Sequence, residues 1–196
     1  MRNKTLILTL LLVFALVFTS FTINSKNPGD TIDNFTINNY DGKSYSPDEL
    51  KNYKALIIMF WSTECPNVQP YTERINSLAK EFESKGFIFW AINSNSTESV
   101  NEVKEHALKN GYPFPVLKDN NNVVADLFDA TKTPEVFVLS PERVILYHGR
   151  IDDNRDEEKV TSEDLKKALD EIYAGGEVTV KSTKHFGCTI KRAGDD

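Results

Sequence analysis

The residues of this sequence best suited to chemistry are its two cysteines, Cys65 and Cys188. Two thiols cannot form a disulfide framework or a four-thiolate zinc site, but they can form one disulfide, or one of them can act as a nucleophile. Cys65 lies in segment 60–66, which reads FWSTECP and ends a continuous apolar run. This places the thiol between a predicted buried strand and a predicted helix, with Pro66 suited to the first helical position.

A cysteine at the start of a helix is a candidate nucleophile. The free backbone N–H groups and the helix dipole favour a thiolate there, which lowers the pKa of the thiol. One pKa unit corresponds to about 1.4 kcal/mol, roughly what a partly buried helix start supplies. The alternative is an inert cysteine that packs like a small hydrophobic residue. We expect Cys65 to be the reactive one.

The elements that must position this cysteine alternate along the chain. Continuous apolar runs predict two buried strands, at 55–61 and 87–92. Apolar periodicity and capping residues predict helices at 66–85, 97–109, 122–128 and 162–173. Hairpins are predicted at 35–43 and 135–147. Because crossover helices join strands that run in one direction, this order predicts an α/β fold with a parallel core and antiparallel strands at one side.

Composition limits the classes of protein that this chain can represent. The 196 residues are 40% hydrophobic and 27% charged, which is an ordinary globular balance and excludes a disordered chain. The formal net charge of −6 argues against a nucleic-acid partner.

The first 25 residues differ from the rest of the chain. Arg2 and Lys4 precede an apolar run at 6–18, and no acidic residue occurs before Asp30. These features predict a signal peptide or an uncleaved anchor at 1–25, ahead of one domain at 30–192. We therefore expect an exported protein, periplasmic or secreted, that contacts a membrane only if this segment is retained. Export would expose the cysteines to an oxidising compartment.

Several motifs, in order, resemble the thioredoxin superfamily, and specifically the peroxiredoxin-like (redoxin) proteins of the alkyl hydroperoxide reductase/thiol-specific antioxidant group. The resemblance covers about 30–192 and is carried by the segments 65–66 (CP), 91–95 (AINSN), 111–115 (GYPFP), 133–137 (TPEVF), 149–154 (GRIDDN) and 186–191 (FGCTIK). It implies a thioredoxin-like three-layer sandwich with a central mixed β-sheet. It also implies an antioxidant oxidoreductase acting on a peroxide or a disulfide, with a reducing partner protein or a small thiol.

The resemblance also implies roles for individual residues. Cys65 would attack the substrate, with Ser62 as the hydroxyl residue three positions before it. Pro134 would follow a cis peptide bond and pack against Cys65, leaving nearby backbone groups free for a substrate. The alternative for Pro134 is an ordinary proline at a strand entry.

Departures from the family pattern limit the expected activity. Ser62 stands where thioredoxins have their first cysteine, so dithiol exchange within one motif is impossible. Ile58 stands where peroxiredoxins have a proline, and their later arginine has no clear equivalent near 132–136. Because fast peroxide chemistry needs that electrostatic clamp, we expect slow peroxide reduction.

Cys188 lies in the tail after the last predicted helix and is the candidate partner of Cys65. A bond between them could be a resolving disulfide in catalysis or a structural staple, and closing so long a loop could stabilise the fold by roughly 4 kcal/mol. The alternative is a second, unrelated cysteine.

Neither a metal nor a cofactor is predicted. The three histidines, His106, His148 and His185, show no ligand spacing, and the acidic residues at 152–158 lack a calcium-loop pattern, which favours a solvated charge run. Two classes of function remain: an exported thiol-dependent oxidoreductase, or a thioredoxin-fold binding or scaffold protein that has lost turnover.

Overall fold

The computed structural model describes residues 26–194. The predicted N-terminal signal or anchor segment, 1–25, lies outside the described residues. None of the helices within 26–194 is both long enough and apolar enough to cross a membrane.

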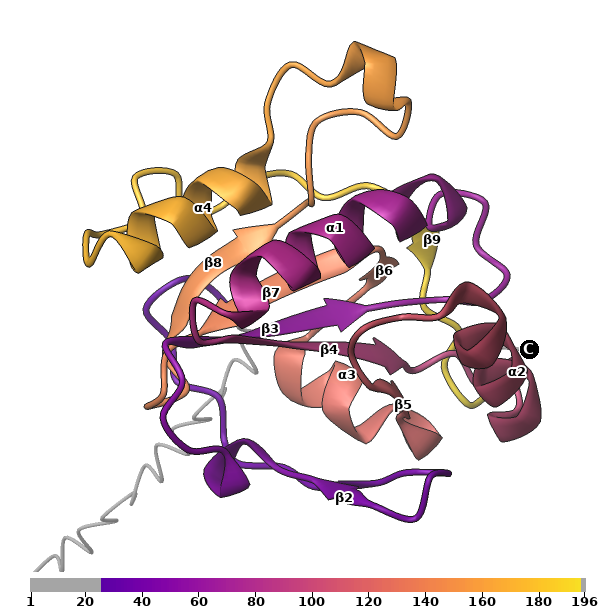
Figure 1. Ribbon diagram of the computed structural model, residues 1–196. Coiled ribbons are helices and arrows are strands. Elements are labelled where there is room, and N and C mark those ends of the chain that lie inside the picture. The colour runs from indigo at the N-terminus through magenta and orange to yellow at the C-terminus, as the bar shows by residue number, and fades with distance from the viewer. Residues whose placement is uncertain (1–25, 195–196) are drawn as a thin grey trace, which may run out of the picture.

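A five-stranded mixed sheet forms the centre of the molecule (Figure 1). Its strand order is β5-β4-β3-β7-β8, with β3, β4 and β5 parallel and with β7 antiparallel to both β3 and β8. The strands are β3 (Ala55–Phe60), β4 (Phe87–Asn93), β5 (Val116–Lys118), β7 (Glu135–Leu139) and β8 (Ile145–Gly149). The predicted mixed sheet is therefore confirmed, with β5 added to the strands expected from the sequence.

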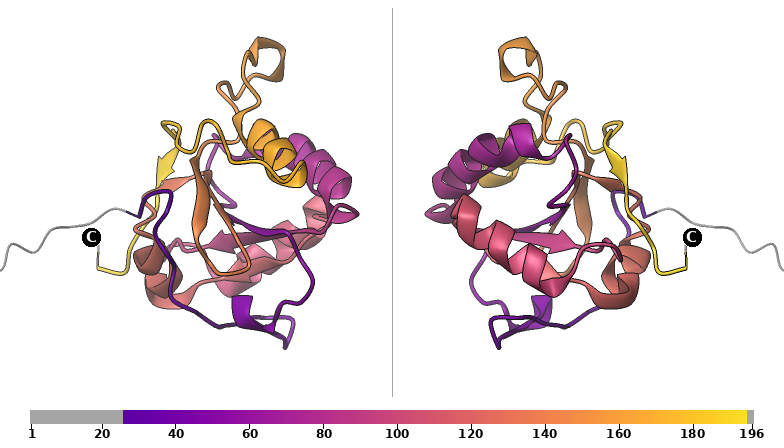
Figure 2. Two further views of the ribbon diagram at one scale, coloured as in Figure 1. Left: turned by 90° about the vertical axis from the view of Figure 1, so that its left-hand side faces the viewer. Right: turned by 90° about the vertical axis from the view of Figure 1, so that its right-hand side faces the viewer.

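Both faces of the sheet are covered, which makes three layers (Figure 2). Side chains of β3 alternate between two apolar clusters, so that Ile57 enters one and Ile58 the other. One cluster includes residues of three helices, α1 (Thr72–Glu83), α2 (Val100–Asn110) and α4 (Asp164–Tyr173). The other includes α3 (Val123–Phe128) and the hairpin strand β1 (Ile37–Asn38), which pairs with β2 (Ser44–Tyr45). Burial on both faces explains why β3 is a continuous apolar run.

The helix after Cys65 begins later than predicted. The sequence predicts a helix from residue 66, but α1 starts at Thr72, and the chain before it forms successive turns and the 3₁₀ helix η2 (Gln69–Tyr71). Pro70 gives the physical reason, because it has no N–H to donate and disfavours the α conformation at Gln69. Other helix starts move less. Helix α2 is capped by Ser99 and Glu102 in a reciprocal capping box rather than by Thr97, and α4 starts at Asp164.

The C-terminal segment, residues 177–192, returns across the molecule after α4 (Figure 1). It runs beside β8, where His148 N donates to Lys181 O (3.0 Å) and Thr183 N donates to His148 O (3.1 Å). It then forms β9 (Cys188–Thr189), which pairs antiparallel with β6 (Lys132–Thr133). This pairing, which has no signal in the sequence pattern, brings Cys188 beside the Thr133–Pro134 peptide.

Candidate active site

Cys65 and Cys188 are joined by a disulfide bond in the structure. Their Cα atoms lie 6.0 Å apart, although 123 positions separate the two residues in the sequence. Neither cysteine is free, so the structure represents the oxidised form of the pair.

Cys65 is held at the end of β3, with only 3% of its surface exposed. The hydroxyl oxygen of Ser62 accepts hydrogen bonds from the backbone N–H groups of Glu64 (3.2 Å) and Cys65 (3.1 Å), which fixes the turn that follows the strand. The sulfur of Cys65 lies 3.3 Å from the carbonyl oxygen of Thr133. The structure thus brings Ser62 and Cys65 together as predicted, with the Ser62 hydroxyl bonded to the backbone N–H of Cys65.

The peptide bond between Thr133 and Pro134 is cis, as the sequence predicts. Pro134 directly precedes β7, and the Thr133 carbonyl faces Cys65. The backbone expected to stay free for a substrate is instead paired within the chain, since Thr133 lies opposite Cys188 in the β6–β9 ladder. The C-terminal segment therefore covers this position in the oxidised form.

Cys65 does not lie at the start of a helix, so the predicted activation of its thiol by a helix dipole is wrong. Cys65 is not the N-cap of α1, since its carbonyl oxygen accepts from Val68 N (2.9 Å) in a turn that precedes η2. The dipole of α1 acts within its own first turn, which begins at Thr72.

A buried carboxylate, Glu98, anchors the Cys65 loop and is absent from the residues predicted from the sequence. It is 2% exposed and accepts five hydrogen bonds. The donors are the hydroxyls of Ser62 (2.5 Å) and Thr63 (2.5 Å), the backbone N–H of Thr63 (2.7 Å), and the side-chain amides of Asn93 (2.6 Å) and Asn95 (2.8 Å). A carboxylate has about four lone-pair positions, so Glu98 is saturated as an acceptor.

Lys118 extends this network on the β5 side. Its ammonium group donates to the side-chain oxygen of Asn93 (3.1 Å) and to the carbonyl oxygen of Asn95 (2.6 Å). Burial lowers the pKa of Lys118, although nearby carboxylates, Glu98 first among them, oppose the shift. Asn95 also reaches the C-terminal segment, because its side-chain oxygen accepts from the backbone N–H of Lys191 (2.9 Å). One polar network therefore touches both the Cys65 loop and the segment that carries Cys188.

Cys188 sits against the cis-proline loop with little space to spare. A Cβ atom at the preceding Gly187 would lie 2.1 Å from the carbonyl oxygen of Thr133, a distance that real Cβ atoms do not reach. Glycine is thus required for β9 to come this close to β6. The amide of Asn67 lies 3.5 Å from the sulfur of Cys188, and Asn67 also accepts from Arg155 (3.3 Å).

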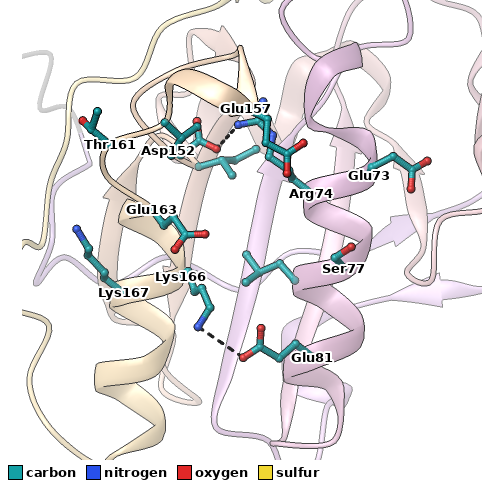
Figure 3. Close-up of a pocket in the computed structure, with 13 residues that line it drawn as sticks. Glu73, Arg74, Ser77, Glu81, Asp152, Glu157, Thr161, Glu163, Lys166 and Lys167 are labelled. Atoms are coloured by element: carbon teal, nitrogen blue, oxygen red, sulfur yellow. Dashed lines mark hydrogen bonds and ion pairs between the residues drawn. The ribbon is translucent and has the colours of Figure 1, made fainter.

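A polar groove of about 530 Å³ lies between α1 and α4 (Figure 3). Arg74 on α1 pairs with Asp152 and donates to the backbone carbonyls of Asn154 (3.0 Å) and Arg155 (2.6 Å), so it pins the acidic loop to the helix. Asp152 is buried, and the expectation that the whole acidic run is solvated is therefore wrong for this residue. Neither cysteine lines the groove, which is separate from the disulfide.

Comparisons with known proteins agree with this geometry. Residues 28–148 match the AhpC/TSA family. The chain belongs to that family. Among curated relatives, the AhpC/TSA chain is 28% identical to "Thiol-disulfide oxidoreductase ResA" of Bacillus subtilis (strain 168) over 138 residues, which are 68% of this chain and 75% of the relative.

Solved structures extend the likeness of this AhpC/TSA member to most of its length. A hypothetical protein from Sinorhizobium meliloti 1021 is 32% identical, with a TM-score of 0.81, over 87% of this chain and 97% of the other. A putative thioredoxin from Neisseria meningitidis is 22% identical, with a TM-score of 0.62, over 77% and 92%. The fold is thioredoxin-like, of the thiol-disulfide oxidoreductase type, with its cysteine pair joined as a disulfide.

Proposed function

We propose that this protein is an exported thiol-dependent oxidoreductase in which Cys65 attacks the substrate and Cys188 resolves the product. The observation that carries the proposal is the bond between these two cysteines beside the cis Thr133–Pro134 peptide. A pair of cysteines that reach each other in one chain can store and release two electrons. The likeness to a protein named thiol-disulfide oxidoreductase supports the same chemistry.

With a disulfide as substrate, the cycle balances as two exchange steps. The Cys65 thiolate attacks one sulfur of the substrate, forms a mixed disulfide and releases the other substrate sulfur as a thiolate. The Cys188 thiolate then attacks the Cys65 sulfur, which forms the bond seen in the structure and releases the second substrate thiolate. The substrate gains two electrons, and a reducing partner protein or a small thiol must return two electrons to the pair.

With a peroxide as substrate, the Cys65 thiolate attacks one peroxide oxygen and becomes a sulfenic acid, and an alcohol or water leaves. The Cys188 thiol then condenses with the sulfenic acid, which releases water and forms the same disulfide. We expect this reaction to be slow. In the stretch where the family's arginine is expected, Lys132 directs its ammonium to the hydroxyl of Thr189 (2.9 Å) rather than to the sulfur.

Turnover requires the C-terminal segment to move, because Cys65 is buried and β9 covers the backbone beside it. The low burial of the segment supports such a movement, since only Val178 and Ile190 within residues 177–192 are buried. The burial of Cys65 also favours a second candidate, a thioredoxin-fold binding or scaffold protein in which the bond is a permanent staple.

A thiol titration with trapping separates the two candidates. We expect glutathione buffers to reduce the native protein reversibly and to reveal two thiols per chain. Cys188→Ser, once reduced, should form a mixed disulfide between Cys65 and an added disulfide peptide. Cys65→Ser has no sulfur at position 65 and should form no adduct there. A bond that persists in the folded protein under millimolar dithiothreitol, with no adduct on Cys188→Ser, would favour the scaffold.

Export is proposed from the sequence of the N-terminal segment alone, in which Arg2 and Lys4 precede the apolar run 6–18. Fusion of residues 1–25 to an alkaline phosphatase that lacks its own signal should give active, exported phosphatase. Fractionation then distinguishes a cleaved signal, with phosphatase released, from an anchor, with phosphatase on the membrane. Inactive phosphatase in both fractions contradicts export.

A further inference from the structure

Two histidines from different parts of the chain converge on one buried carboxylate, Glu135. Glu135 is the first residue of β7, His148 lies on β8, and His185 lies on the C-terminal segment. The possible ligand atoms of the three side chains all lie within 4.8 Å of one another. The histidines show no ligand spacing along the sequence, because these residues become neighbours only when the sheet and the C-terminal segment assemble.

The carboxylate of this cluster is fixed before any ligand arrives. Glu135 is 1% exposed, and its Oε2 accepts from the backbone N–H groups of Thr131 and Lys132, each at 2.8 Å. The other oxygen, Oε1, faces Nε2 of His148 at 2.8 Å. Hydrogen bonds of this kind orient the carboxylates that bind metal ions. The Lys132 ammonium donates to the hydroxyl of Thr189 (2.9 Å).

The imidazoles are also held in place. The ring of His148 stacks on Phe137, with ring centres 4.0 Å apart and planes at 11°, and the ring of His185 stacks on His148 at 5.2 Å. Nε2 of His185 lies 3.5 Å from Oε2 of Glu135. Both imidazoles therefore present the same nitrogen to one carboxylate, and both side chains are partly exposed, which leaves the outer side of the cluster open to water.

We propose that Glu135, His148 and His185 bind a divalent metal ion of the zinc type, with a fourth position left for water. Two imidazoles and one carboxylate are a donor set that zinc accepts in tetrahedral geometry. Bonds of about 2.0–2.1 Å place tetrahedral ligand atoms about 3.3 Å apart. The distance is 2.8 Å from His148 Nε2 to Oε1 of Glu135 and 3.5 Å from His185 Nε2 to Oε2 of the same carboxylate. Because all the candidate ligand atoms lie within 4.8 Å of one another, binding one ion requires the side chains to close on it by roughly an ångström.

This site has a structural consequence for the thiol pair, although it uses neither cysteine. His185 is three residues before Cys188, while Glu135 and His148 belong to the sheet. A bound ion therefore ties the C-terminal segment to β7 and β8 independently of the disulfide. The alternative is that the histidines only hydrogen-bond the buried carboxylate, and this alternative is an outcome of the test.

Zinc binding to the full chain with its disulfide intact tests the proposal, because oxidised cysteines cannot bind the ion. Isothermal titration of metal-free protein with Zn²⁺ should give one ion per chain. His185→Ala should weaken binding by at least tenfold, since losing an outer partner alone costs about 10–100-fold. His106→Ala, which removes the third histidine of the chain, on α2, is the matched control and should bind as the wild type does.

His185→Gln keeps a polar contact to Glu135 and serves if the alanine variant does not fold. Zn²⁺ should raise the melting temperature of the wild type and of His106→Ala, and it should leave that of His185→Gln unchanged. The proposal is overturned if the wild type binds no zinc. It is also overturned if the His185 variants bind zinc as tightly as the wild type, or if His106→Ala alone loses the ion.

Discussion

The two cysteines of this protein sit in regions that are held together by different forces. Around Cys65, residues 55–62 are all buried, and the loop is tied to the buried carboxylate of Glu98. Around Cys188, the C-terminal segment is mostly exposed and is held by backbone hydrogen bonds, such as His148 N to Lys181 O (3.0 Å) and Ser96 N to Lys191 O (2.8 Å).

This difference predicts which cysteine moves. Apolar burial and a saturated buried carboxylate are lost only when the core opens, and an unpaired buried group is costly. A surface hydrogen bond exchanges with water at a net cost of about 1 kcal/mol. We therefore expect Cys65 to be the fixed member of the pair and Cys188 the member that leaves and returns, and four predictions test that division of roles.

The largest effect is expected from replacing each cysteine in turn. Cys65→Ser should abolish turnover of a disulfide substrate or a peroxide, because the remaining thiol, Cys188, has no partner cysteine in the chain with which to complete the two-electron exchange. Cys188→Ser should complete the first attack and stop there, as a mixed disulfide or as a sulfenic acid that over-oxidises with excess peroxide. Mass spectrometry of the two variants after one turnover checks this. Equal activity of Cys65→Ser and the wild type would contradict it.

Removing the crosslink should weaken the fold and loosen one region more than the other. Because the bond closes a loop of 123 residues, its loss in Cys188→Ser should lower the free energy of unfolding by roughly 4 kcal/mol on chain-entropy grounds. Denaturant titration measures this value. Hydrogen exchange should show lost protection in residues 177–192 and unchanged protection in β3 and α1. Equal loss in both regions would erase the contrast between them.

Glu98→Gln should destabilise the Cys65 side by about 3 kcal/mol. In the variant, an NH₂ group replaces one of the two carboxylate oxygens. That NH₂ faces the side-chain NH₂ of Asn93 or of Asn95, so buried donors lose their acceptor. The exposed Glu102, which completes the cap of α2, is the matched control. Glu102→Gln keeps the capping-box pattern and should cost well under about 1 kcal/mol in the same chemical denaturation experiment. If the two variants lose the same free energy of unfolding, Glu98 does not anchor the Cys65 loop.

The smallest effect is expected from Ser62→Ala. The hydroxyl accepts from two backbone N–H groups and donates to Glu98, so its loss should cost about 1–2 kcal/mol and slow the reaction of reduced Cys65 with iodoacetamide severalfold. Ser77→Ala, on the exposed face of α1, should change neither quantity. An alkylation rate unchanged from the wild type would mean that the turn does not position the sulfur.

Local patterns in the sequence predict much of this fold. The apolar runs give β3 and β4, the Asp41–Gly42 turn gives the small hairpin, and the motif at 133–137 indicates the cis peptide. The sequence predicts too early a start for α1, because the apolar stripe continues through η2, where Pro70 prevents an α-helix.

Contacts between distant segments could not be predicted in the same way. Glu98 looks like any acidic residue of a polar loop, and its burial depends on where Ser62 and Asn93 meet. The β6–β9 ladder consists of two residue pairs, too few to give a periodic signal. Gly187 is a local sign that two segments approach closely, but the sequence does not indicate that the other segment is the Thr133 carbonyl.

The long span of the disulfide also fixes an order of events during synthesis. All five strands of the central sheet precede Cys188 in the sequence, so Cys65 stays an unpaired thiol until the last part of the chain has been made. This sequence offers Cys65 a single partner, so no mispaired bond can form within the chain, and an isomerase has nothing to correct. A chain whose translation stops before residue 188 keeps the sheet sequence but carries a thiol that can only pair with another molecule.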